Sequence, residues 1–301
     1  MRLRLIFFGM TGHFSLPPLA ALLTAEAEVA AVITPARSPT TANRPRRLAA
    51  PPPAPSDLPL LNPYVTPNIL HLSWGHGIPV WEVGKLTEPP TLELMASLQP
   101  DLMVVACFPD RFPRTLLQLP RFGCLNLHPA LLPAYRGPAP LFWQARRGEP
   151  QTGVTLHFLD EGLDTGDIVA QAAWPWPDGL AEAELERLAA EAGANLVAAA
   201  VEQLAHGRAL PRRPQPEMGS HYFPWPAEPD FIIPTDWPAR RAFNFLRAAA
   251  SWPLVIAVGI KRFSIRIAID YRSEQSLGWP YVLRGDELLI QFEPGVLRVK
   301  L

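Results

Sequence analysis

The sequence predicts an α/β protein with a mostly parallel sheet, followed by a small second domain rich in β-strand. Short, largely apolar segments, such as residues 3–8, where Arg4 is the one charged residue, and 102–107, alternate with helical patterns in the first part. Strands of a parallel sheet are buried on both faces, so they are apolar throughout rather than alternating. After residue 254, short β-like segments separated by glycine turns predict the second domain.

Length and composition indicate a globular protein. The chain has 301 residues, of which 48% are hydrophobic and 18% charged, enough to bury a sizeable core. Its formal net charge of −1 argues against a uniformly basic nucleic-acid binder and leaves room for a local basic patch. Cys107 and Cys124 are too few for a disulfide framework or a cysteine zinc site. We therefore expect reduced thiols in the cytoplasm and, since no apolar segment is long enough, no membrane span.

The first strand, helix and strand are predicted over residues 3–8, 16–23 and 28–34. This order implies a right-handed crossover between parallel strands. Gly9 and Gly12 follow the first strand and could cradle an anion. The acidic residue that a dinucleotide fingerprint places after the second strand is missing, so a nucleotide cofactor is disfavoured.

Residues 36–67 form a proline-rich stretch in which we expect no regular structure. Its arginines, among them Arg44, Arg46 and Arg47, make a local basic cluster. One interpretation is a solvated loop. The other is a flexible arm for a phosphate-bearing substrate.

The remaining pattern predicts further elements and two domain boundaries. Helices are predicted over 68–76, 91–98 (capped by Thr91), 138–144, 181–206 and 239–250, and strands over 77–80, 102–107, 124–128, 152–159 and 168–172, the first of them at a sheet edge. We expect a catalytic domain over 1–208, a proline-rich linker over 209–230 and a small β domain over 231–301.

The segment 124–168 holds most of the polar groups suited to chemistry. Asn126 and His128 stand two apart at the end of a predicted strand, so both side chains point to the same face. Pro129 stops the strand there. Asp164 lies on a glycine-bounded turn after the following strand. We expect these three side chains to meet at one site.

An amide, an imidazole and a carboxylate without an adjacent Ser or Cys nucleophile favour direct acyl transfer between two bound molecules. Asn126 and a protonated His128 would donate hydrogen bonds to the oxyanion, and Asp164 would help move the proton of an attacking amine. The alternative is a structural histidine with an aspartate that only forms a turn. A metal site could add nearby ligands, but no spacing supports it; those ligands would be His157, Asp160 and Asp167.

The motif Asn126-Leu-His128-Pro-Ala-Leu-Leu-Pro-x-x-Arg136-Gly137, followed by Gly153-Val-Thr and Asp160-x-Gly162-Leu-Asp164-Thr-Gly166-Asp167-Ile, resembles the signature of the 10-formyltetrahydrofolate-dependent formyltransferases. The resemblance covers roughly residues 3–208 and implies a formyltransferase domain of Rossmann-like type. It implies that Asn126, His128 and Asp164 are the catalytic trio. Ala130 stands where the family has a serine, so a hydroxyl contact is absent there.

The resemblance also implies 10-formyltetrahydrofolate as co-substrate and no metal. The folate is expected in the crevice beyond the central strands, at Ala106, Phe108, Pro109, Leu132, Pro133, Leu159, Asp160 and Gly162. Phe108 and Pro109 replace a glycine that the family usually carries. The acceptor is expected at Gly12, Arg44, Arg46, Arg47, Arg136 and Gly137.

The C-terminal part, with Asp236-Trp237 and Ser251-Trp252-Pro253, resembles that of the methionyl-tRNA formyltransferases. In them it is a small, OB-type β-barrel that helps bind tRNA; here it looks truncated. The resemblance implies a cytoplasmic monomer of one-carbon metabolism that formylates methionyl-tRNA for protein biosynthesis. Lysines are scarce throughout the sequence, which argues against strong binding of tRNA. The alternatives are a formyltransferase for nucleotide-linked amino sugars, a formyltetrahydrofolate hydrolase-like enzyme and a degenerate folate-binding protein.

Overall fold

The computed structural model describes residues 2–25, 27–36, 44–51 and 67–301. They form two compact units, each composed of several chain segments. Unit 1 comprises Met1–Pro133, Gly153–Ala172 and Arg187–Ser220, and unit 2 comprises Ala134–Thr152, Ala173–Glu186 and His221–Leu301. The predicted division at residues 208 and 231 remains a prediction. Residues 209–220 belong to unit 1, and residues from His221 onward belong to unit 2.

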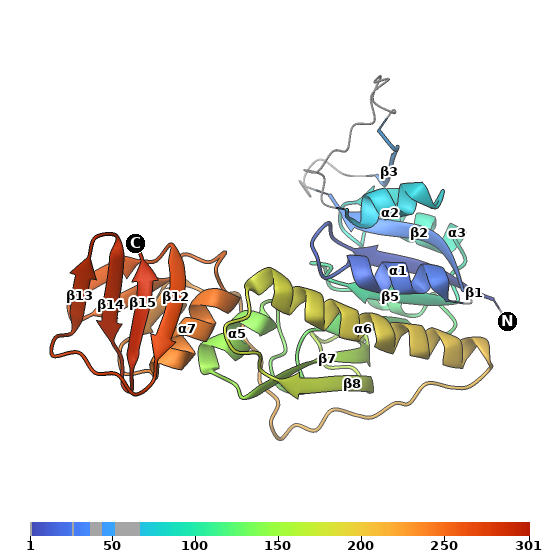
Figure 1. Ribbon diagram of the computed structural model, residues 1–301. Helices are drawn as coiled ribbons and strands as arrows, with labels where there is room; N and C mark the ends of the chain where they lie inside the picture. The colour runs from blue at the N-terminus through green and yellow to red at the C-terminus, as the bar shows by residue number, and fades with distance from the viewer. Residues whose placement is uncertain (1, 26, 37–43, 52–66) are drawn as a thin grey trace. The chain divides into compact units, whose positions relative to one another are not determined.

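Unit 1 is built on an eight-stranded sheet in the order β3-β4-β2-β1-β5-β6-β7-β8 (Figure 1). Its strands are β1 (Leu3–Gly9), β2 (Ala27–Pro35), β3 (Arg46–Leu48), β4 (Val80–Val83), β5 (Leu102–Ala106), β6 (Cys124–His128), β7 (Gln151–Phe158) and β8 (Ile168–Pro175). The strands β4, β2, β1, β5 and β6 pair in parallel, whereas β3 with β4 and β6 with β7 are antiparallel. The predicted mostly parallel sheet is confirmed.

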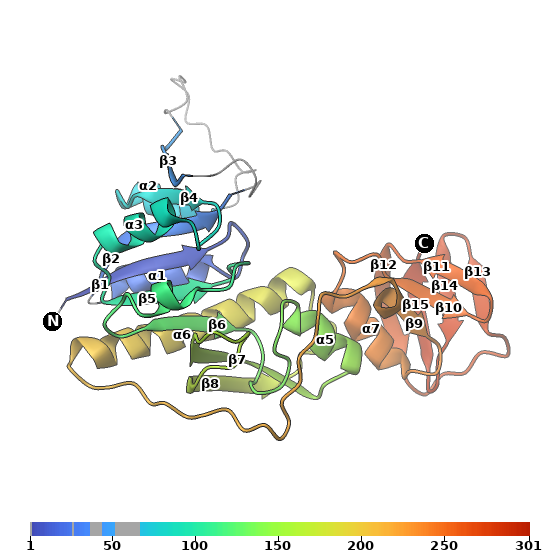
Figure 2. The same cartoon turned by 180° about the vertical axis from the view of Figure 1, so that it is seen from behind.

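Helices pack on both faces of this sheet. They are α1 (Leu16–Thr24), α2 (Ile69–Gly75), α3 (Pro89–Ser97), α4 (Arg114–Leu117) and the long α6 (Glu182–Ala205), which starts in unit 2. Figures 1 and 2 show α1 and α2 on one face and α3 on the other. The arrangement matches the crossover connections that a parallel sheet requires.

The helix α3 begins earlier than predicted. Glu88 is its N-cap residue, and Pro89 and Pro90 occupy the first turn, where proline presets the backbone angle of a helix. Thr91 therefore lies inside the helix and is buried, so its prediction as the cap was wrong. The helix α2 has the cap that its sequence favours, since the Asn68 side chain accepts hydrogen bonds from two backbone N–H groups.

The sheet edge differs from the prediction. Residues 46–48 form β3, paired with β4 through the register Arg46↔Glu82, so regular structure does occur within the 36–67 stretch. Pro45 precedes this strand rather than interrupting it, and an edge strand needs backbone partners on one side only. The strand β4 is consequently one place in from the edge. Residues 37–43 and 52–66 of the predicted loop, including Arg37, lie outside the described residues.

The core of unit 1 lies around the central strands. The strand β5 is buried along its whole length, and Phe7 and Phe8 of β1 are fully buried. Because neither face of these strands meets water, polar groups suited to chemistry are expected near the carboxyl ends of the strands and in the loops that follow them.

Unit 2 combines helices with two small sheets. Its elements are α5 (Pro140–Arg147), η1 (Glu228–Phe231), β9 (Ile232–Pro234), α7 (Ala239–Ala248), β10 (Val255–Val258), β11 (Lys261–Ser264), β12 (Ile267–Arg272), β13 (Tyr281–Arg284), β14 (Glu287–Gln291) and β15 (Val296–Lys300). The sheets have the orders β11-β10-β9 and β12-β15-β14-β13, and the second is antiparallel throughout. The predicted C-terminal β domain is confirmed. Phe142 of α5 packs edge-on against Phe245 of α7, with ring centroids 5.1 Å apart.

Candidate active site

The strand β6 presents Asn126 and His128 on one face. It pairs with β7 in the register Asn126↔His157 and His128↔Thr155, so His157 is the cross-strand neighbour of Asn126. Asn126 is half-buried, His128 is buried, and His157 is fully buried. The sheet thus holds two imidazoles and an amide together where β6 ends.

The turn between β7 and β8 brings Asp164 to the same place. Asp164 adopts a left-handed backbone conformation, with φ of 56°, which aspartate tolerates better than most residues. Its carboxylate oxygens lie 3.7 Å from His128 Nδ1 and 3.7 Å from His157 Nε2. Asn126 Nδ2 lies 3.5 Å from Asp164 Oδ1. The structure therefore brings the three predicted residues together, with His157 as a fourth.

His157 fixes the orientation of the Asn126 amide. Its Nδ1 lies 2.8 Å from the carbonyl oxygen of Phe158, which can only accept, so Nδ1 carries the hydrogen and Nε2 is an acceptor. Asn126 Nδ2 donates to this Nε2 over 3.1 Å. The other N–H of the amide is left with the long contact to Asp164, at the limit of a hydrogen bond, and is the one that can turn to a bound carbonyl.

The environment of His157 keeps its imidazole neutral. Burial lowers the pKa of His157 to about 4, although the nearby Asp164 carboxylate acts in the opposite direction. A neutral ring with one fixed hydrogen serves as a hydrogen-bond acceptor and not as an acid at neutral pH. Sequence reasoning considered His157 only as a metal ligand. The signal it missed was the antiparallel register that places His157 beside Asn126.

Replacing His157 by glutamine is expected to make the free energy of unfolding depend less on pH below pH 6.5. The folded-state pKa of about 4 lies below the ordinary value of 6.5, so the unfolded chain binds a proton in this window that the folded chain does not. Stability of the wild type therefore falls as the pH drops from 6.5 toward 4, by on the order of 3 kcal/mol for a shift of this size.

Urea unfolding midpoints between pH 4.5 and 7 measure this effect. Glutamine keeps an acceptor for Asn126 and does not titrate, so its midpoints should vary less with pH. The charged groups facing this ring, Asp164, His128 and Asp160, remain in both proteins. His206→Gln, an exposed change directly after α6, is the control and should follow the wild type. Identical pH slopes for His157→Gln and wild type would refute the buried neutral histidine.

The predicted folate residues at the end of β5 are held by the core. The carbonyl oxygen of Ala106 accepts a hydrogen bond of 2.7 Å from the buried Ser15 hydroxyl. Phe108 packs edge-on against Phe8, with ring centroids 5.4 Å apart, and Pro109 is exposed. A flat apolar side chain therefore stands where the family usually has glycine, and it is anchored rather than projecting freely.

The predicted folate residues after β6 are held by two polar side chains, the buried Thr155 and the exposed Gln171. The N–H of Leu132 donates to the Thr155 hydroxyl over 3.1 Å, and its carbonyl accepts from Gln171 Nε2 over 2.9 Å. Thr155 donates in turn to the carbonyl oxygen of Ala130, where the family has serine. Pro133 follows, half-buried, as the last residue of this part of unit 1. These contacts make the wall beside His128 rigid.

The loop after β7 is shaped by Asp160. Its Oδ1 accepts hydrogen bonds from the N–H of Gly162, at 3.0 Å, and from the Thr165 hydroxyl, at 2.6 Å. A Cβ on Gly166 would lie 2.0 Å from the carbonyl oxygen of Phe158, so only glycine fits there. The N–H of Leu159 donates to the carbonyl oxygen of Cys124 over 2.8 Å. The Asp-x-Gly-Leu-Asp-Thr-Gly motif thus builds the turn that presents Asp164.

The residues that were predicted to bind the acceptor are spread over several segments of the chain. In unit 1, Gly12 is exposed, and Arg46 forms an ion pair with Glu82 over 2.9 Å. Arg44 is exposed, and Arg47 lines a cavity of about 400 Å³ beside Trp74.

Arg136 and Gly137 belong to unit 2. The backbone of Arg136 exchanges hydrogen bonds with His221 and Phe223. Gly137 has φ of 118°, and a Cβ there would lie 2.0 Å from the carbonyl oxygen of Phe223. The glycine of this motif is therefore required by packing in unit 2.

Other chemistries find no support in the described part of the chain. Within it, no group of three or more His, Cys, Asp or Glu side chains could hold a metal ion. Burial raises the pKa of the Cys124 thiol to about 12, so this cysteine is not a nucleophile at neutral pH. None of the described helices is both long and apolar enough to cross a membrane.

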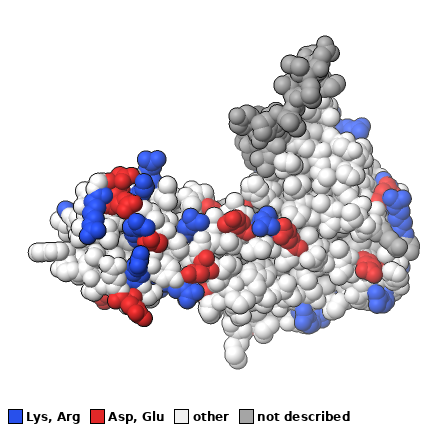
Figure 3. Space-filling model, in the orientation of Figure 1, with Lys and Arg blue, Asp and Glu red and all other residues white. Residues whose placement is uncertain are grey.

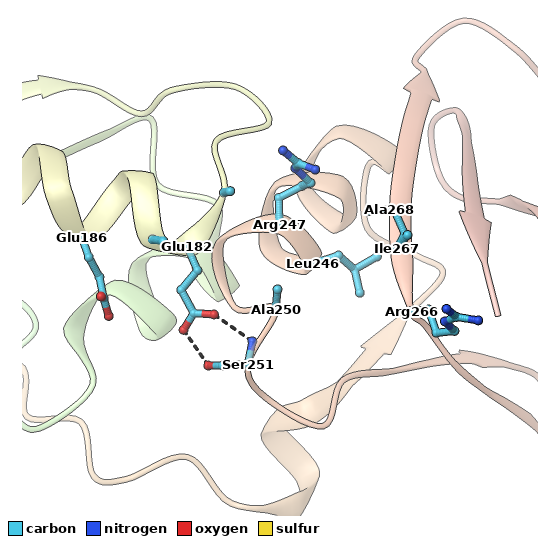
Figure 4. A pocket seen from close by; sticks show the side chains of 11 residues that line it. Glu182, Glu186, Leu246, Arg247, Ala250, Ser251, Arg266, Ile267 and Ala268 are labelled. Atoms are coloured by element: carbon cyan, nitrogen blue, oxygen red, sulfur yellow. Dashed lines mark hydrogen bonds between the residues drawn. The ribbon is translucent and has the colours of Figure 1, made fainter. Parts of the chain in front are cut away.

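A cavity of about 520 Å³ lies in unit 2, between the start of α6, the end of α7 and β12 (Figure 4). Its lining includes Glu182, whose carboxylate accepts hydrogen bonds from the Ser251 N–H, at 2.8 Å, and the Ser251 hydroxyl, at 2.7 Å. Arg247 donates to the carbonyl oxygen of Gly179 over 2.9 Å. These side chains already hold neighbouring segments together, and none of them belongs to the predicted trio.

Unit 1 is a Rossmann-like sheet in which an amide, an imidazole and a carboxylate meet near the strand ends. The sequence matches the formyl transferase family over residues 3–201. It is 36% identical over 236 residues to the methionyl-tRNA formyltransferase of Syntrophus aciditrophicus. The aligned part covers 77% of this chain and 68% of that protein. It is also 36% identical over 252 residues to the methionyl-tRNA formyltransferase of Moorella thermoacetica, where the aligned part covers 83% of this chain and 74% of that protein. The chain belongs to the formyl transferase family and is a formyltransferase.

A solved structure of similar fold extends the likeness over the whole chain. It is the N-formyltransferase from Helicobacter canadensis in complex with folinic acid and dTDP-3-aminofucose. Its TM-score is 0.68 at 17% identity, with 100% of this chain and 99% of that chain covered. At this identity the likeness shows the fold alone. The predicted fold class and enzyme class are confirmed.

Proposed function

We propose that this protein transfers the formyl group of 10-formyltetrahydrofolate to the amino group of methionyl-tRNA. The relatives named methionyl-tRNA formyltransferase support this acceptor, because they are similar over more than three quarters of the chain. The observation that carries the reaction is the meeting of Asn126, His128 and Asp164 at the end of β6.

The roles of the three residues follow from the charge that develops. The amine nitrogen attacks the formyl carbon, a C–N bond forms, and the carbonyl oxygen becomes an oxyanion. Asn126 Nδ2 and a protonated His128 donate hydrogen bonds to this oxygen. Asp164 accepts the proton that the amine loses, directly or through water, and keeps the imidazolium of His128 in place. The bond between N10 and the carbon then breaks, N10 takes up a proton, and tetrahydrofolate leaves.

The proposed folate site fits the loops that follow β5, β6 and β7. The pterin would meet backbone near Ala106 and the Leu159–Leu163 loop, where the main chain is fixed by Ser15 and Asp160. A rigid wall of this kind lowers the entropy cost of binding a flat ring. The formyl group would then lie against Asn126.

The acceptor is tested by supplying candidates one at a time. The purified protein is incubated with 10-formyltetrahydrofolate and charged initiator methionyl-tRNA, and both tetrahydrofolate release and the formylated product are followed. We expect release that depends on the tRNA. Release without any acceptor would indicate a hydrolase, and folate binding without release would indicate a degenerate binding protein.

A nucleotide-linked amino sugar is a second candidate acceptor, and one observation favours it. The cations of unit 2 are interspersed with carboxylates, as Figure 3 shows, and several are ion-paired: Arg240 with Asp178, Arg298 with Asp270, and Lys300 with Asp286. Paired cations release few counterions on binding RNA, so they contribute little to affinity. A panel of nucleotide amino sugars in the same assay separates the two acceptors. If only a nucleotide amino sugar gives a formylated product, that sugar replaces methionyl-tRNA as the proposed acceptor.

A further inference from the structure

Residues 212–215 run along the turn of unit 1 that carries Asp164, although their proline-rich sequence predicted a linker. Arg213 and Ile168 of β8 exchange two backbone hydrogen bonds, of 2.8 and 3.1 Å, in an antiparallel bridge. The Arg212 guanidinium lies over the ring of Phe158, 3.6 Å from its centroid, and pairs with Asp167 over 3.6 Å. We call residues 212–215 the strap. It contacts both strands that flank the Asp164 turn.

The last residue of the strap contacts the turn itself. Gln215 Nε2 donates to the carbonyl oxygen of Asp164 over 2.9 Å and to that of Gly166 over 2.7 Å. One side-chain amide nitrogen thus bridges two carbonyl groups two residues apart. Gln215 is half-buried, which shields these bonds from competing water.

We propose that Gln215 is a positioning residue for catalysis, which holds the backbone of the turn so that the Asp164 carboxylate faces Asn126 and His128. The inference rests on the proposed function, since it acts through Asp164. The direction of the Asp164 side chain depends on a left-handed φ of 56°. The two carbonyls that Gln215 bridges belong to Asp164 itself and to the glycine after the next residue.

The geometry explains why a donor is needed at this place. Two carbonyl oxygens that converge on one point repel each other unless a donor lies between them. Glutamine supplies two N–H groups from a single nitrogen and adds no charge beside Asp164 and Asp167. A carboxylate there would add a third negative group, and an alkyl side chain would leave both oxygens without this donor.

Three variants test the proposal in the formyl-transfer assay. Gln215→Leu removes the donor at similar volume, and we expect kcat to fall about tenfold to a hundredfold, the loss typical of misplaced catalytic groups, while KM for the folate changes little. Gln203→Leu is the matched control, because Gln203 Nε2 also donates to a backbone carbonyl, that of Ala209 over 2.5 Å, but on α6. Its kcat should equal that of the wild type.

The third variant, Gln215→Glu, separates positioning from simple stability. As a carboxylate it lacks a donor, and as the acid it regains one O–H. Its activity relative to the wild type should therefore rise as the pH is lowered from 8 to 5. The charged groups near it, Arg212, Arg213, Asp164 and Asp167, are present in both proteins. A ratio independent of pH would overturn the proposal, even if Gln215→Leu fails to fold.

The failure of this proposal is distinguishable from failure of the proposed function. If Asp164→Asn is inactive and Gln215→Leu is as active as Gln203→Leu, the trio stands and the positioning role is wrong. If Asp164→Asn retains full activity, the proposed chemistry is wrong whatever Gln215 does.

Discussion

Replacing Asp164 by asparagine is expected to lower kcat for formyl transfer about a thousandfold or more, within the range for loss of a positioned acid or base. Asparagine has the same shape, so the turn and the folate site should persist. It cannot accept the proton that the attacking amine loses in the proposed reaction. In the wild type, a carboxylate oxygen of Asp164 lies 3.7 Å from His128 Nδ1.

Stopped-assay kinetics and folate binding measured by fluorescence check this result. Binding of 10-formyltetrahydrofolate should stay within about threefold of the wild type, because the lost interaction belongs to the transition state. Asp101→Asn is the matched control. Asp101 accepts a hydrogen bond of 2.8 Å from the N–H of Arg4, outside the turn that carries Asp164. Full activity of Asp164→Asn would remove Asp164 from the mechanism.

Replacing Asn126 by leucine is expected to slow formyl transfer about a hundredfold or more, since an oxyanion donor is typically worth about 3–4 kcal/mol of barrier. Leucine keeps the volume on β6 and removes the N–H that can turn to the formyl oxygen. It also leaves His157 Nε2 without its donor at 3.1 Å. kcat and kcat/KM should fall together, as they do when an interaction exists only in the transition state.

A second asparagine gives the control for this variant. Asn68→Ala removes the side chain that caps α2, so it should cost about 1 kcal/mol of stability without lowering kcat. If Asn126→Leu loses no more kcat than Asn68→Ala, the oxyanion role is excluded. If kcat falls but the folate no longer binds, the amide serves binding rather than the transition state.

Much of unit 1 could be predicted from sequence because its strands are buried on both faces. The apolar segments that became β1 and β5 admit few other interpretations. The meeting of Asn126 with His128 followed from the period of two along β6. Asp164 was found through the glycines of its turn, whose tight packing leaves room for no side chain at Gly166.

The missed features depend on pairing between distant segments. The role of His157 is set by the register of β7 against β6, which no local pattern reports. Gln215 acts on a turn 51 residues earlier in the chain, from a stretch whose prolines predict only a connector. The strand β3 is short, charged and at an edge, so it lacks the apolar pattern that reveals buried strands.

The strap bears on how this protein can be divided into pieces. A fragment that ends at residue 208, the boundary predicted from sequence, would contain Asn126, His128 and Asp164 but not Gln215. Such a fragment would keep every residue of the trio and lose the amide that bridges the Asp164 and Gly166 carbonyls. A fragment meant to keep this contact must therefore extend beyond Gln215, and the last segment of unit 1 ends at Ser220.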